Sequence, residues 1–273
     1  MQPSQDTAIV GLWQPCSTLW RREMVRFLRQ RSRIIGALGT PLVFWLLVGG
    51  GLKQSFKLPG VDSRMTYLEY SFPGAIVAIL LFTAIFSMIS IIDDRKDGFL
   101  QAVLVAPVSR ASIALGKILG AMTLAVGQAL VFLALGRLAD IRMGALSIAA
   151  TFATMTLVAF ALSGLGFVIA WRMESTQGFH AIMNLVLMPM LVISGAFFPP
   201  GGSATWLRWI MLVNPVTYGV TLLRWAMYLD SPAPHPSLDG SLAAAWVVTI
   251  LFACTMFLLS MLAVRQDAAR VLQ

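Results

Sequence analysis

Six long apolar segments set the strongest constraint on how this chain folds. Each approaches or exceeds the roughly 20 apolar residues that an α-helix needs to cross the hydrocarbon core of a bilayer. Of the 273 residues, 58% are hydrophobic and 12% are charged. Soluble domains carry about 25% charged residues, so this chain belongs in a membrane. The six segments are 34–52, 69–92, 112–135, 145–170, 179–198 and 241–264.

Within these segments the apolar residues run on without the alternation of period two that is typical of membrane β-strands. We therefore predict an all-α polytopic membrane protein, with six transmembrane helices in a single domain over residues 1–273. A further apolar stretch, 199–230, is interrupted by polar and helix-breaking residues and is predicted to form a re-entrant helical hairpin between spans 5 and 6. The interrupting residues are Arg208, Asn214, Pro215 and Arg224.

The basic residues predict the orientation. Six arginines lie in residues 21–33, directly before the first span. By the positive-inside rule this end faces the cytoplasm, and an even number of spans returns the C-terminus to the same side. Residues 1–33 show no apolar segment followed by a small-residue cleavage site, so we expect no cleavable signal peptide.

Residues 17–33 are predicted to form an amphipathic helix in the membrane interface. On a helical wheel Trp20 lies on an apolar side, whereas Arg22, Arg26 and Arg29 lie on the opposite side, where we expect them to contact lipid phosphates. A net charge of +8 is also typical of nucleic-acid binding. We expect membrane lipids and no nucleic acid as partners, because the arginines cluster beside a span and no soluble domain presents them.

The sequence offers little chemistry for a cofactor. Its two cysteines, Cys16 and Cys254, lie in the N-terminal region and within the last span, so we expect neither a disulfide nor a metal site. The phosphate-binding pattern G-x-x-x-x-G-K-[ST] is absent, and Lys117 in "LGKIL" lacks both the glycine spacing and the hydroxyl. The chain is therefore predicted to bind no cofactor and to hydrolyse no ATP by itself.

The stretch 93–110, "DDRKDGFLQAVLVAPVSR", is the most charged segment between two spans. Gly98 to Ala106 can form about two helical turns with one apolar side, and Pro107 ends them. An isolated helix of this length is marginal in water, so another surface must pack against it. The neighbouring spans alone could supply that surface, or the helix could be a docking element for a soluble partner.

This stretch resembles the coupling-helix region of the ABC-2 type transporter permeases. Its departures from that family's pattern are Phe99, where threonine is usual, and Gln101, where glutamate is usual. The matching residues are Arg95, Gly98, Leu100, Pro107, Ser109 and Arg110. A second stretch, "SGAFFPP…WLRWIMLVNPVTYGVTLLR", resembles the same family through Ser194, Gly195, Phe198, Pro199, Trp206, Leu207, Asn214, Pro215, Thr217, Tyr218 and Arg224.

The resemblance implies a non-catalytic permease subunit of an ABC exporter in a bacterial inner membrane. Its partners would be two copies of an ABC ATPase subunit, which bind ATP and Mg, and a second permease subunit, either an identical copy or a paralogue. The substrate would be hydrophobic or amphipathic: a drug, lipid or glycolipid.

The resemblance also assigns roles to individual residues. Contact with the ATPase would come from Asp94, Arg95, Gly98, Phe99, Leu100, Gln101, Leu104, Pro107 and Arg110. The re-entrant exit would involve Pro199, Asn214, Pro215, Tyr218 and Arg224. We expect Asn214 to take up free backbone groups at a turn between two half-helices, and Arg224 to extend to the far membrane interface.

Two other functions fit the sequence less well. An ion-coupled secondary transporter usually needs carboxylates buried in the bundle, and every acidic residue here falls near a span end or in a loop, with Glu69 the nearest exception. An intramembrane hydrolase would need a histidine within reach of a serine such as Ser163 or Ser194. His180 and His235 are expected at the two opposite faces of the membrane, away from both serines.

Overall fold

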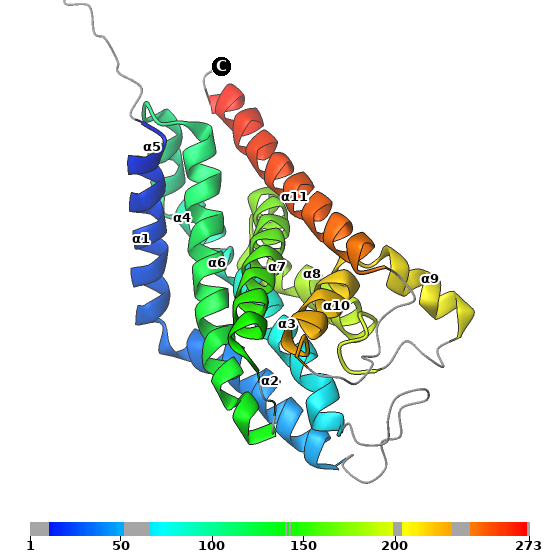
Figure 1. Cartoon of the computed structure of the whole chain (residues 1–273). Coiled ribbons are helices and arrows are strands. Elements are labelled where there is room, and N and C mark those ends of the chain that lie inside the picture. Colours follow the sequence, from blue (N-terminus) through cyan, green and yellow to red (C-terminus); the bar gives the residue numbers. More distant parts are fainter. Residues whose placement is uncertain are drawn as a thin grey trace, which may run out of the picture.

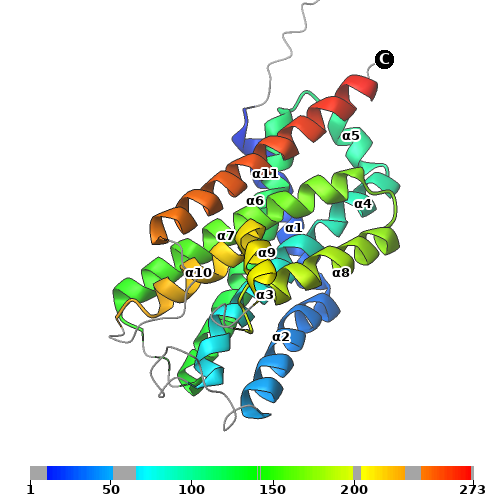
Figure 2. The same cartoon turned by 90° about the vertical axis from the view of Figure 1, so that its right-hand side faces the viewer.

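A bundle of α-helices makes up the part of the chain that the computed structural model describes (Figures 1 and 2). The described residues are 11–51, 66–139, 141, 143–198, 204–230 and 241–271, and no β-strand occurs within them. The helices are α1 (Trp13–Arg29), α2 (Arg31–Gly51), α3 (Tyr67–Ser87), α4 (Ile89–Lys96), α5 (Phe99–Val105), α6 (Arg110–Ala134), the 3₁₀ helix η1 (Leu135–Ala139), α7 (Ala145–Arg172), α8 (Thr176–Val192), α9 (Thr205–Val213), α10 (Pro215–Met227) and α11 (Leu242–Val271).

Every predicted span is helical for most of its length, but the helices differ in how well they match a bilayer. Four are long and apolar enough to cross it: α3 with α4, α6, α7 and α11. A fifth is present if α1 and α2, which are bent by 79° where they meet, count as one span. With 17 residues α8 rises about 25 Å, which is shorter than the hydrocarbon core. The described helices thus supply four to five spans by length and composition.

The helix α3 forms the centre of the bundle. In the most apolar part of the α3–α4 span 89% of the residues are buried inside the protein, against 22% in α11 at the periphery. Ile76, Ile79, Leu80 and Ile85 are all fully buried, so the apolar residues of α3 face neighbours in every direction. A helix that is hydrophobic all round suits this central position.

The short helices α4 and α5 lie at one end of the bundle. The first residue of α1 and the last residue of α11 lie at this same end (Figure 1). The predicted short helix is confirmed as α5, and it follows a sharp turn at Gly98, whose φ of 74° is left-handed and favours glycine. Ala106 adopts an extended conformation before Pro107, which ends the helix as expected.

The predicted break in the 199–230 region is confirmed at Asn214, between α9 and α10. The Asn214 side chain accepts a hydrogen bond from the Val216 N–H (3.0 Å) and donates one to the Met190 carbonyl (2.6 Å). Pro215 takes the first position of α10, where its missing N–H costs nothing. Pro199 lies outside the described residues.

Candidate functional site

Two glycines of α6 allow α1 to approach closely at the α4–α5 end of the bundle. A Cβ atom on Gly116 would lie 2.9 Å from the Cys16 carbonyl oxygen, and one on Gly120 would lie 2.9 Å from the Glu23 Cβ. Small residues four apart on a membrane helix commonly permit such contact between helices. The Trp20 indole adds a hydrogen bond to the Thr123 hydroxyl (3.1 Å). The N-terminal helix is therefore packed along α6.

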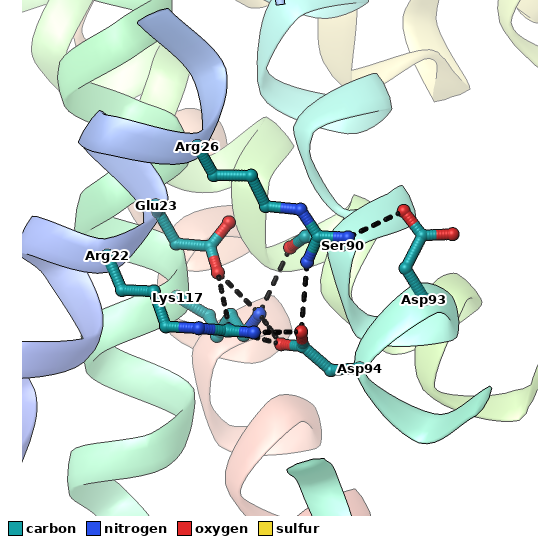
Figure 3. Close-up of polar contacts among 7 residues, drawn as sticks. All are labelled: Arg22, Glu23, Arg26, Ser90, Asp93, Asp94 and Lys117. Atoms are coloured by element: carbon teal, nitrogen blue, oxygen red, sulfur yellow. Dashed lines mark hydrogen bonds and ion pairs between the residues drawn. The ribbon is translucent and has the colours of Figure 1, made fainter. Parts of the chain in front are cut away.

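The close packing determines where the polar side chains of α1 point. The side of α1 that faces α6 contains Cys16, Leu19, Glu23 and Phe27, all buried. At 100° per residue, Arg22 and Arg26 flank this side and are directed toward α4. Both belong to a group of polar side chains from three helices, which we call the charge cluster (Figure 3). Its members are Arg22, Glu23 and Arg26 of α1, Ser90, Asp93 and Asp94 of α4, and Lys117 of α6.

Asp94 lies at the centre of the charge cluster. Its two carboxylate oxygens accept hydrogen bonds from both terminal nitrogens of Arg22 (2.8 and 2.6 Å) and from Nη1 of Arg26 (2.9 Å). The Lys117 ammonium donates to both Asp94 and Glu23. Asp94 thereby joins three helices that are distant in the sequence.

The outer part of the charge cluster is more accessible. Arg26 also donates to Asp93 (3.0 Å), and the side chains of Arg22, Arg26 and Asp93 are 33%, 24% and 27% exposed. Lys117 and Asp94, in contrast, are only 3% and 0% exposed. The cluster therefore has a sealed centre and a rim that the surroundings can reach.

Burial at the centre is tolerable because the charges balance. The charge cluster contains three basic and three acidic side chains, and removing one partner of such a buried pair typically costs about 3–5 kcal/mol. The expectation that no carboxylate lies inside the protein is wrong for Asp94 and Glu23, both of which are buried. Asp94 lies near the end of α4 and Glu23 lies in the middle of α1, and tertiary packing against α6 covers both.

The charge cluster also contacts α5 directly. The Arg22 guanidinium lies 3.8 Å from the centre of the Phe99 ring, so one side chain contacts residues on both sides of the Gly98 turn. At the other end of α5, Arg110 donates to the Leu104 carbonyl (2.6 Å), where a helix leaves its last carbonyl groups free. Both ends of this seven-residue helix are thereby held to longer neighbours.

Arg95 connects α4 to the opposite neighbour. Its guanidinium donates to the carbonyl oxygens of Trp171 and Met173 (2.9 Å for Met173), at the C-terminal end of α7. A cation at that position also interacts favourably with the helix dipole. Consecutive residues of the charged stretch thus bind different helices: Asp94 binds α1 and α6, and Arg95 binds α7.

The residues predicted to contact an ATPase separate into a buried and an exposed group. Leu100 and Leu104 are buried against the bundle, like Asp94, and the contact of these residues with an ATPase stays a prediction. Gly98, Gln101 and Pro107 are exposed, whereas Phe99, Arg95 and Arg110 are partly buried. Val105, which the sequence did not single out, is 65% exposed. The exposed face of α5 is therefore formed by Gln101, Ala102 and Val105.

The contact of the α1 arginines with lipid phosphates stays a prediction, and the structure shows in addition that Arg22 and Arg26 pair with the carboxylates of α4. Arg29 is exposed, as is Arg21. The apolar residues Val25 and Leu28 are also exposed, and Trp20 is half-exposed while bound to Thr123.

A second polar cluster lies at the opposite end of α3. Tyr67 and Tyr70 donate to the carbonyls of Phe197 (3.1 Å) and Gly195 (2.9 Å) in the segment that follows α8. Arg224 of α10 also donates to Gly195 O (3.1 Å), and its guanidinium lies 4.3 Å from the Tyr70 ring centre. We call Tyr67, Tyr70, Arg224 and Tyr228, whose hydroxyl donates to Glu69 O (2.6 Å), the tyrosine–arginine cluster.

This geometry corrects the expectation for Arg224. The side chain is 2% exposed and lies inside the bundle rather than extending to an interface. The ring of Tyr70 and a main-chain carbonyl provide its surroundings, which explains why a charge is tolerated there. Tyr218 has a local role, donating to the Leu212 carbonyl (2.7 Å) across the α9–α10 break.

Among the described residues named for a hydrolase, no serine is hydrogen-bonded to a histidine; His235 lies outside the described residues. The Ser194 hydroxyl donates to the Leu191 carbonyl (2.6 Å), and His180 packs against the Phe86 ring instead (5.1 Å between ring centres). Glu69, the exception among the acidic residues, accepts from the Thr66 N–H (2.8 Å) and caps α3. Within the described ranges, no three His, Cys, Asp or Glu side chains group as metal ligands do.

Sequence reasoning missed four members of the charge cluster: Glu23, Ser90, Asp93 and Lys117. Lys117 offered a signal, since a lysine inside an apolar span needs a partner. The pattern G-x-x-x-G from Gly116 to Gly120 surrounds it and indicates a packed helix face. Nothing in the sequence indicated that α1 would be the helix that packs there.

Known proteins give an independent comparison. The profile of a family described as ABC-2 type transporter matches residues 14–228. A putative transport permease, ycf38 of Cyanophora paradoxa, is 26% identical over 216 residues, which cover 78% of this chain and 73% of the relative. The daunorubicin resistance ABC transporter permease protein DrrB1 of Streptomyces coeruleorubidus is 25% identical over 233 residues, covering 83% and 78%.

A third relative is longer. The probable multidrug ABC transporter permease YbhR of Escherichia coli K12 is 26% identical over 195 residues, which cover 71% of this chain and 52% of the relative. This chain therefore spans about half the length of that permease.

Proposed function

Because this chain belongs to the ABC-2 type transporter family, we propose that it is the membrane-spanning, non-catalytic subunit of an ATP-driven exporter. In this proposal a separate ABC ATPase, present in two copies, binds ATP and Mg and docks at the α4–α5 end. A second permease subunit, identical or paralogous, completes the path. The single domain proposed over residues 1–273 sits in a bacterial inner membrane, with both termini in the cytoplasm.

One observation carries the proposal: α5 exposes one face, while its other residues and both of its ends contact the bundle. Gln101, Ala102 and Val105 face outward, while Leu100 and Leu104 pack into the bundle. A seven-residue helix would not hold its shape alone, and here Arg22 and Arg110 contact its two ends. A push on the exposed face would therefore reach α1, α4 and α6.

The side chains of the spans indicate which class of substrate to propose. Outside the charge cluster and the tyrosine–arginine cluster, the described helices present mainly apolar side chains. Such a path suits a hydrophobic or amphipathic molecule, which we propose as the substrate class. The multidrug and daunorubicin names of two relatives support this choice. An ion-coupled mechanism has less support, since Asp94 and Glu23 are both paired with cations.

The proposal predicts that the exposed face of α5 contacts the ATPase. Val105→Asp places a carboxylate on that face, where the side chain is already 65% exposed, so the fold should be kept. An unpaired charge at the contact should lower transport-coupled ATP hydrolysis at least about tenfold. Leu100→Asp is unsuitable for this purpose, because it would place a charge in the core.

Crosslinking tests the same face in membranes that also contain the ABC ATPase with which this permease is proposed to work. A cysteine at Gln101, in a chain carrying Cys254→Ser, should crosslink to the ATPase. The unmodified chain, whose exposed Cys254 lies on α11, is the matched control and should not. Normal coupling in Val105→Asp, together with an uncrosslinked Gln101→Cys, would contradict the assignment.

A further inference from the structure

The surface of α1 that faces away from the bundle contains an open, strongly basic groove. It has a volume of about 560 Å³, in the range of small-ligand sites. Seven residues line it: Thr18, Arg21, Arg22, Val25, Arg26, Arg29 and Gln30. Four arginines and no acidic residue are among them, so the groove suits an anion.

The four arginines differ in how their charge is used. Arg22 and Arg26 bind Asp94 and Asp93 on the side of α4. Among the residues that the structure describes, no salt bridge occupies Arg21 or Arg29, and both are exposed. Arg21 and Arg29 lie eight residues apart on the side of α1 that forms the groove, with Val25 between them. The groove therefore holds about two positive charges beyond those that the protein neutralises.

Apolar side chains beside the arginines select the kind of anion. Val25, Leu28 and Trp13 are 42%, 64% and 71% exposed on α1. A soluble phosphate would leave this apolar surface in water, whereas a phospholipid would cover it with an acyl chain while its phosphate binds the arginines. Each basic residue near an anionic membrane surface contributes about 1 kcal/mol.

We infer that the α1 groove binds the phosphate headgroup of an anionic inner-leaflet phospholipid between Arg21 and Arg29. The inference rests on the proposed function for one point only, that the α4–α5 end faces the cytoplasm. The same groove exposes the rim of the charge cluster, Arg22 and Arg26.

The test measures lipid selectivity of the purified permease without any ATPase, so a failed ATPase assignment leaves it intact. Spin-labelled phosphatidylglycerol and phosphatidylcholine are compared for their association with the protein in vesicles of phosphatidylcholine. The wild type should favour phosphatidylglycerol several-fold. Arg21→Gln with Arg29→Gln should remove most of that preference, because neither arginine takes part in the charge cluster.

The matched control is Arg172→Gln with Arg265→Gln, which removes the same charge from exposed positions on α7 and α11. It should keep the preference. Equal association of both lipids with the wild type, or an equal loss in both double variants, would overturn the inference. Full displacement of phosphatidylglycerol by millimolar inorganic phosphate would assign the groove to a soluble anion and would equally overturn it.

Discussion

The charge cluster and the tyrosine–arginine cluster lie toward opposite ends of the α3–α4 span and use different kinds of acceptor. In the charge cluster, arginine and lysine donate to the side chains of Asp93, Asp94 and Glu23. In the tyrosine–arginine cluster, phenols and a guanidinium donate to main-chain carbonyls, among them Gly195 O and Phe197 O. Both clusters join helices that are distant in sequence, but only the first depends on the identity of the acceptor residues.

This difference has a mechanical meaning. Carbonyl acceptors hold an irregular, buried segment in place, since the residues after α8 have no helical partner for their backbone groups. Carboxylate acceptors instead join whole helices, and their bonds can be exchanged for others without unfolding the backbone. In the proposed exporter, the end that receives the ATPase therefore has exchangeable contacts, and the opposite end has fixed ones.

The largest effect is expected when the charge cluster loses its buried cation. Lys117→Met leaves Glu23 and Asp94 buried with less compensation, and should lower the free energy of unfolding by about 3–5 kcal/mol. Adding Glu23→Gln removes the unpaired carboxylate and should recover much of that loss. Thermal unfolding in detergent measures both variants. A double variant no more stable than Lys117→Met would contradict the view that acceptor identity governs this cluster.

A smaller effect without rescue is expected in the tyrosine–arginine cluster. Arg224→Met removes a charged donor from Gly195 O and its contact with Tyr70, at a cost of about 1.5–3 kcal/mol. No second substitution can change a carbonyl acceptor, so only Arg224→Lys should retain part of the stability. Arg137→Met, at an exposed arginine of η1, serves as the control and should be near neutral. If a substitution at Gly195 restored the stability lost in Arg224→Met, the two clusters would not differ in their dependence on the acceptor residue.

The smallest effect should come from the rim of the charge cluster. Arg26→Gln removes a partly exposed partner of Asp93 and Asp94 and should cost at most about 1 kcal/mol. At 1 M salt the Debye length is only about 3 Å, so interactions between exposed charges are strongly screened. The difference in the free energy of unfolding between the wild type and Arg26→Gln should therefore shrink as salt is raised. The cost of Arg224→Met should stay constant over the same range. Equal salt dependence of the two would show that exposure does not distinguish the clusters.

The sequence predicted the helices well, because long apolar runs and proline–glycine breaks are local signals. The end of α5 before Pro107 and the turn at Asn214 follow from the residues at those positions. The family resemblance also identified α5 as an element of interest. Span counting was less direct, because α8 ends at Val192, earlier than its apolar run.

The candidate site was only half visible in the sequence. Asp94 and Arg95 stood out as charges, but their partners are set by the packing of α1 on α6, which two glycines permit. Arg22 looked like a lipid contact because a helical wheel shows which residues share a side and not what covers that side. Arg224 was misplaced for the same reason, since it contacts the Tyr70 ring of α3 and the Gly195 carbonyl of the segment after α8.

The packing of α1 on α6 has a consequence for the order in which the protein is assembled. Helix α1 is translated before its partners: Asp94 follows Arg22 by 72 residues, and Lys117 follows Glu23 by 94. At roughly 5–20 residues per second, the ribosome needs about 5–20 s to supply the second of these partners. Until then Glu23 lacks the Lys117 cation that pairs with it in the folded protein. The final docking of α1 therefore has to follow the synthesis of α6.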